Sequence, residues 1–151
     1  MKLQGAVTVN APQEKVWQVF LDPVQLCKVI PGCEQARQLD ATHYEAVLSV
    51  KVQFMTIRSQ AKGTLLEAIA PRHMVGELVG EPTAMAGAFR ARVTIDLDSV
   101  GNTTSVRYAM DLTLLGRLAS MGEAIVRSTS KQLTQQFAEN IATLFNNSDR
   151  S

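Results

Sequence analysis

The side chains that could do chemistry are few and scattered. The 151 residues include two histidines, His43 and His73, and both fall at a turn or a strand start, outside any nucleophile or metal-binding motif. No G-x-S-x-G elbow, H-E-x-x-H, P-loop or G-x-G-x-x-G is present. Asp96 and Asp98 lie near a strand end, where we expect solvated carboxylates and not a catalytic pair. The sequence therefore predicts no catalytic residue, no metal site and no enzyme activity.

The two cysteines, Cys27 and Cys33, lie six residues apart across a Pro-Gly turn. One C-x5-C pair without a neighbouring histidine does not supply the four ligands of a structural zinc site. The N-terminus has no signal-peptide h-region. We therefore expect two reduced, partly buried thiols in a cytoplasmic protein.

Composition excludes further classes of function. Fifteen Lys and Arg against fourteen Asp and Glu give a net charge of +1, so no field of one sign favours nucleic acid. Hydrophobic residues make up 46%, as in a globular domain, and six methionines accompany an aromatic content of 5%. No run approaches the roughly 18 apolar residues of a membrane-spanning helix. We expect one domain over residues 1–146 and a disordered polar tail over 147–151.

The expected elements are a strand, two short helices, a run of strands and one long helix. Alternating residues predict a strand over 3–9, and Pro12 and Asp22-Pro23 are typical of the starts of two short helices. Apolar residues at steps of three and four predict an amphipathic helix over 117–146. Turn residues divide the chain between these helices at 39–42, 51–55, 70–72, 80–83 and 99–102. The fold class is α+β, a curved antiparallel sheet of six to seven strands around a long C-terminal helix.

Alternation along each strand separates an inner face from an outer face. Arg58 and Lys62 share an outer face, for example, whereas Ile57 and Leu65 share the inner face. Because protein cores pack nearly as densely as crystals, small inward residues mean either a very close helix or a cavity. The pattern leaves both open. The small inward residues are Ala46, Ser59, Ala61, Gly63 and Ala91.

Five segments resemble one protein family. They are Met1-Lys2-Leu3-x-Gly5, Ala11-Pro12-x-Glu14-x-Val16-Trp17, Leu21-Asp22-Pro23, Ile30-Pro31-Gly32-Cys33-Glu34 and Gly116-Arg117-Leu118-Ala119-Ser120-Met121-Gly122. In these segments the chain resembles the G-subunit family of carbon monoxide dehydrogenase, within the START-like (helix-grip, Bet v 1-like, SRPBCC) superfamily. The resemblance covers almost the whole chain and implies a hydrophobic cavity between the sheet and the long helix.

The resemblance also implies a function. It points to an accessory protein of molybdenum hydroxylases such as aerobic carbon monoxide dehydrogenase, and not to a catalytic component. It implies contact with dehydrogenase subunits, recruitment of the enzyme to the inner face of the membrane, and carriage of a non-covalently bound, menaquinone-type quinone. The shared motifs are caps, turns and packing residues, so they transfer no catalytic role.

We therefore predict a carrier of a lipophilic molecule, in which the segments 51–55 and 80–87 gate the cavity. Tyr108 combines an apolar ring with a hydrogen-bond donor and would bind a ligand carbonyl. The predicted ligand-binding residues are Leu26, Ile30, Phe54, Ala61, Met85, Phe89, Tyr108, Met110, Met121, Ile125 and Phe137. Two alternatives stay open. One is a polyketide cyclase or aromatase-like enzyme using the inward Tyr108 or Ser59, and the other is an assembly factor with a filled core.

Overall fold

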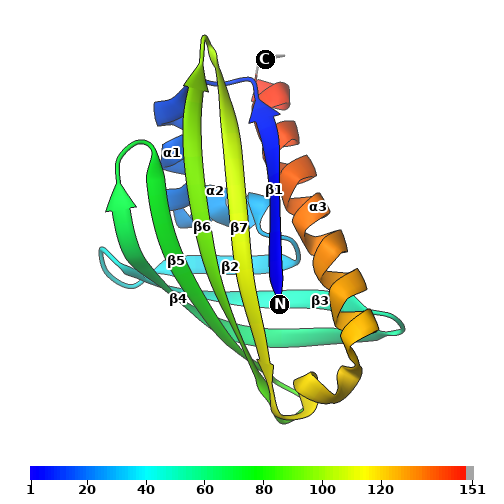
Figure 1. The fold of residues 1–151 in the computed structure, drawn as a ribbon. Helices are drawn as coiled ribbons and strands as arrows, with labels where there is room; N and C mark the ends of the chain where they lie inside the picture. The colour runs from blue at the N-terminus through cyan, green and yellow to red at the C-terminus, as the bar shows by residue number, and fades with distance from the viewer. Residues whose placement is uncertain (149–151) are drawn as a thin grey trace.

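A curved antiparallel sheet and a long helix make up most of the molecule (Figure 1). The structure is a computed structural model and describes residues 1–148. Within them the sheet has seven strands in the order β1-β7-β6-β5-β4-β3-β2, which confirms the predicted α+β helix-grip architecture. The elements are β1 (Lys2–Val9), α1 (Gln13–Leu21), α2 (Pro23–Val29), β2 (Cys33–Gln38), β3 (His43–Val52), β4 (Met55–Ile69), β5 (His73–Pro82), β6 (Ala88–Val100), β7 (Thr103–Leu115), the 3-10 helix η1 (Gly116–Met121) and α3 (Glu123–Ser148).

The sheet bends strongly along its strand order. Figure 1 shows β2, β3 and β4 running at a steep angle to β1, β6 and β7, so the inner face is concave toward α3. A register shift between Leu65 and Glu67 lies in β4, where the sheet turns, as is typical of a bulge. Strand β1 pairs with β7, and the Met1 amino group donates a hydrogen bond of 2.8 Å to the Leu112 carbonyl. The first and last strands therefore form one side of the sheet, beside α3.

Helix α2 starts at Asp22-Pro23, as the sequence predicts. The Asp22 carboxylate accepts a hydrogen bond of 2.9 Å from the Val24 backbone N–H, and Pro23 occupies the first helical turn. The two short helices contact each other and lie over one end of the sheet (Figure 1).

The long helix begins at Glu123 and not at Arg117 as predicted. Gly116 and Gly122 have φ angles of 65° and 94°, and these left-handed positions interrupt the helical path on both sides of η1. The chain uses η1 to reverse direction between β7 and α3. At its other end α3 continues to Ser148, past the predicted boundary at residue 146. The rest of the predicted tail, residues 149–151, lies outside the described residues.

Cys27 and Cys33 form a disulfide, so the prediction of two reduced thiols is wrong. Cys27 lies in α2 and Cys33 is the first residue of β2. The short turn between them brings the two Cα atoms to 5.3 Å, within the range that a disulfide bridges. The bond ties the end of α2 to the edge strand of the sheet.

The close-packed core lies at the end of the molecule that α1 and α2 cover. Trp17 is 4% exposed there. The core unites the two short helices, the ends of β1, β5, β6 and β7 nearest to them, and the C-terminal part of α3. Its members are Val9, Ala11, Val16, Trp17, Val19, Phe20, Val29, Met74, Ile95, Leu97, Val106, Ile141 and Phe145.

Candidate functional site: the cavity between the sheet and the long helix

The inner face of the sheet becomes less buried with distance from the core. On β7, Val106 is fully buried, whereas the next inward residues, Tyr108 and Met110, are half-buried. The same change occurs on α3, where Ile141 is fully buried and Ile125 is half-buried. Helix α3 packs mainly against β1 and α2, so its N-terminal part leaves much of the concave face uncovered. The alternation predicted for the strands is confirmed, but only part of the inner face is packed.

An open cavity of about 490 Å³ lies between the β3–β4 turn and the first turns of α3. This volume falls in the range of about 300–1,000 Å³ that small-molecule sites occupy. Its lining combines two aliphatic side chains with hydroxyl, amide and ammonium groups, so this entrance is amphipathic. The lining residues are Lys51, Gln53, Ala124, Ile125, Ser128, Thr129 and Gln132.

Tyr108 and Phe137 mark the place where the open region meets the core. Their rings are 5.2 Å apart in an edge-to-face arrangement, and Phe137 lies 6.3 Å from Phe20. The Tyr108 ring lies directly over Gly5 of β1, where a Cβ atom would be 2.5 Å from the hydroxyl oxygen. Gly5 is therefore required for the position of this ring.

The Tyr108 hydroxyl is the polar group at this junction. It makes no hydrogen bond within residues 1–148, whereas the Tyr44 hydroxyl donates one of 3.3 Å to the Leu21 carbonyl. Burial raises the pKa of the Tyr108 phenol, so the group stays protonated at neutral pH and can donate a hydrogen bond.

The row of small inward residues is partly filled from within the sheet. Ala46, Ala61 and Gly80 are cross-strand neighbours, and Phe89 pairs with Gly80 on the next strand. The Phe89 ring lies over Gly80 so closely that a Cβ atom there would overlap it. Ala61 is accordingly only 2% exposed. Part of the space over the small residues is therefore filled by Phe89 of the sheet and not by a closely packed helix. The open volume lies nearer to α3.

The predicted ligand-binding residues have different surroundings. Leu26, Tyr108 and Phe137 pack against the edge of the core, and Ile125 lines the cavity. Those that are half-buried without belonging to either group are Ile30, Met85, Phe89, Met110 and Met121.

Phe54 is not part of the wall, and its prediction as a wall residue is wrong. It is 100% exposed, because Val52 pairs with Met55 and leaves Phe54 in the two-residue turn beyond the end of the sheet. The sequence interpretation missed part of the cavity lining on α3. Ala124, Ser128 and Gln132 recur at steps of four beside the apolar stripe, and this spacing could have identified them.

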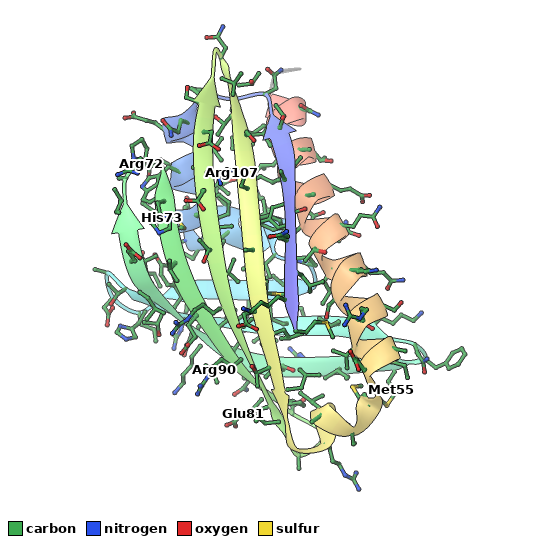
Figure 2. The ribbon with its side chains drawn as sticks, in the orientation of Figure 1. Met55, Arg72, His73, Glu81, Arg90 and Arg107 are labelled. Atoms are coloured by element: carbon green, nitrogen blue, oxygen red, sulfur yellow. A yellow bond between two sulfur atoms is a disulfide. The ribbon has the colours of Figure 1, made fainter. Side chains whose placement is uncertain are left out.

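A separate polar cluster lies on the outer face, away from the cavity. His73 Nδ1 is 2.6 Å from an Asp96 carboxylate oxygen and its Nε2 is 3.5 Å from Glu67. The hydrogen bond to Asp96 is the main cause that raises the pKa of His73. Asp98 is 2.6 Å from Arg107, so both aspartates expected to be solvated are paired. Figure 2 shows His73, Arg72 and Arg107 at this end of the molecule.

Residues 1–148 contain neither a metal-binding cluster nor a membrane-spanning helix. No three His, Cys, Asp or Glu side chains in this range converge in a way that could hold a metal ion. None of the helices in this part of the chain is both long and apolar enough to span a membrane.

A curved antiparallel sheet around a long C-terminal helix places the protein in the START-like helix-grip class. It superposes on a START superfamily protein from Mycobacterium smegmatis with a TM-score of 0.76, 10% identity and 97% of each chain covered. A conserved protein from Geobacillus kaustophilus gives a TM-score of 0.86 at 23% identity, over 98% of this chain and 97% of that one. The Zhui aromatase/cyclase of a Streptomyces species gives 0.72 at 12% identity, over 97% and 93%.

Within this class the chain belongs to the CoxG family, the G-subunit family of carbon monoxide dehydrogenase, whose model matches residues 5–146. A search of curated proteins gives no match. The structural likenesses support the fold, and the family match supports the resemblance found in the sequence motifs.

Proposed function

We propose that this chain is a non-catalytic accessory protein of a molybdenum hydroxylase of the carbon monoxide dehydrogenase type, and that it carries a quinone between the sheet and α3. The observation that carries the proposal is the unpacked half of the interior. Inward apolar residues such as Met110 and Ile125 are only half-buried, and Ile125 lines a cavity of about 490 Å³. Family membership supports the choice of dehydrogenase partner.

The physical basis for binding is the removal of apolar surface from water. Each buried CH₂ group contributes about 0.8 kcal/mol, so a few isoprene units give useful affinity. The ligand would cover the half-buried side chains of the inner face, and Met110 and Met121 can adapt to its shape.

Tyr108 would orient the bound ligand. Its hydroxyl has no partner in the described chain, and its ring is held by Gly5 and Phe137. A quinone carbonyl is an acceptor only, which suits a phenol that stays protonated. In this arrangement the quinone ring lies near Tyr108 and the isoprenoid tail extends toward Ile125 and the amphipathic entrance.

The exchange would take place in the cytoplasm, at the inner face of the membrane, where a lipophilic quinone is available. The chain would take up the quinone there, contact the dehydrogenase subunits and help to bring them to the membrane. Contact with the membrane would be transient.

Quinone binding tests the proposal directly. The purified protein is mixed with a short-chain menaquinone without detergent or lipid, and the complex is measured by native mass spectrometry and by titration. We expect one quinone per chain. The substitution Thr129→Trp places an indole in the cavity and should weaken binding about tenfold, which corresponds to about 1.4 kcal/mol.

Gln135→Trp is the matched control, because Gln135 is an exposed residue of the same helix. Its affinity should equal that of the wild type. Failure of the wild type to retain quinone at saturation would refute the carrier function and favour an assembly factor without a ligand. An equal loss in both variants would show that the cavity is not the binding site.

A further inference from the structure

The hairpin between β3 and β4 ends in an exposed apolar tip, formed by Phe54 and Met55. Phe54 is 100% exposed and Met55 is 48% exposed. Figure 2 shows Met55 at the far end of this hairpin, beside the beginning of α3. Gln53 of the same turn lines the cavity, so the tip forms one lip of its entrance.

The residues of this turn are not those that a tight hairpin turn favours. A two-residue hairpin turn with a positive φ angle usually has Gly, Asn or Asp, but here Gln53 has a φ angle of 54° and Phe54 follows it. The hairpin between β6 and β7 instead has the usual residues Gly101 and Asn102 at its turn. An aromatic residue at this position serves neither the turn nor the core, which points to a role outside the molecule.

The sequence around the tip carries only positive charge. Between Glu45 and Glu67 there is no Asp or Glu, whereas this interval contains three basic residues. Arg58 is paired with Glu34 of β2 at 3.0 Å. Lys51 is exposed at the cavity entrance, close to the apolar tip. An apolar tip with a flanking ammonium group matches the interface of an anionic bilayer, where acyl chains lie beneath negatively charged headgroups.

We infer that the Phe54–Met55 tip inserts into the interface of a bilayer that contains anionic lipid, with Lys51 at the level of the headgroups. A protein partner fits less well, because two side chains provide far less than the roughly 800 Å² per partner of a stable interface. Insertion would turn the cavity entrance toward the lipid. The inference that this tip binds a membrane depends only on its exposure and charge. Only the passage of quinone from the bilayer depends on the proposed function.

Cosedimentation with lipid vesicles tests the inference. The whole chain is mixed with vesicles of phosphatidylcholine containing about one third phosphatidylglycerol, and with vesicles of phosphatidylcholine alone. Phe54→Ser should lower the partition coefficient on the anionic vesicles about tenfold. Val100→Ser is the matched control, since Val100 is 59% exposed beside the turn of another hairpin, and it should change nothing.

The contribution of the Lys51 charge and the insertion of the Phe54–Met55 tip can be measured separately. Lys51→Gln should weaken binding about fivefold on the anionic vesicles only. Phe54→Trp adds an indole whose emission should shift to the blue when anionic vesicles are added, while Trp17 is buried and gives a constant background. No binding by the wild type, or equal losses for Phe54→Ser and Val100→Ser, would overturn the inference.

Two more measurements distinguish the remaining outcomes. If the tip instead binds a second copy of the chain, sedimentation velocity will show a wild-type dimer and a Phe54→Ser monomer, which would refute membrane insertion. Quinone binding of Phe54→Ser in vesicle-free solution should equal that of the wild type. Loss of vesicle binding and loss of quinone binding therefore report independently on this inference and on the proposed function.

Discussion

Helix α3 meets the rest of the molecule differently along its two halves. In the C-terminal half Ile141 is 0% exposed, and the Asn140 side chain donates a hydrogen bond of 3.2 Å to the Val29 carbonyl at the end of α2. In the N-terminal half Ile125 is half-buried beside an open cavity. Apolar residues recur along both halves, with Thr129 between Ile125 and Leu133, and the two ends differ in what faces them. Two short helices close one end, whereas only the curved sheet faces the other.

This contrast shows that an apolar stripe identifies a helix face without showing what covers it. Side chains of the same type contribute to stability at one end and remain available to a ligand at the other. The closed end would hold the shape of the sheet, while the open end would change its contacts when a ligand enters. Making the same substitution at both ends of α3 tests whether the closed end contributes more to stability than the open end.

The largest effect is expected from a pair of identical substitutions on α3. Ile141→Ala leaves a cavity in a fully packed region and should lower the free energy of unfolding by about 2–5 kcal/mol. Ile125→Ala removes a half-buried side chain beside existing space and should cost about 1 kcal/mol or less. Urea unfolding of both variants gives the comparison. Equal losses would mean that the two halves of α3 are equally packed.

A smaller effect is expected from the two tyrosines of the inner face. Tyr108→Phe removes a hydroxyl without a partner in the described chain, so stability should stay unchanged while quinone affinity falls about fivefold, or about 1 kcal/mol. Tyr44→Phe removes the hydrogen bond to Leu21 and should affect stability and not affinity. Titration with a short-chain menaquinone and urea unfolding measure the two effects. Unchanged affinity in Tyr108→Phe would show that the phenol does not contact the ligand.

Local patterns in the sequence predict most of this fold. Alternation separates Arg58 and Lys62 from Ile57 and Ala61, and the structure confirms these faces, because successive side chains of a strand point to opposite faces with a period of two residues. The cap formed by Asp22 and its neighbours is equally local. Features of this kind depend on a few adjacent residues and need no knowledge of the tertiary structure.

The features that the sequence did not predict depend on contacts between distant segments or on turn geometry. The disulfide depends on how closely one turn brings Cys27 and Cys33 together. The beginning of α3 depends on positive φ angles at Gly116 and Gly122, which a helical period does not show. The position of Phe89 over Gly80 depends on a side chain crossing to the neighbouring strand. The cavity depends on contacts and turn geometry of this kind. Small residues in the sequence therefore do not show by themselves whether a cavity exists or where it lies.

The smallest effect is expected on the outer surface near the closed end, where His73 lies beside the buried Met74. The hydrogen bond from His73 to Asp96 raises the pKa of the imidazole above the unfolded value of about 6.5. Because the native state binds this proton more tightly, the stabilisation is complete below the unfolded pKa and is lost as pH rises through the folded pKa. Urea unfolding at about pH 6 and about pH 9 should show a larger loss for the wild type than for His73→Gln. Identical losses would show that the His73–Asp96 pair does not couple protonation to folding. Quinone affinity should be the same in both proteins at each pH, because the pair lies on the face of the sheet opposite the cavity.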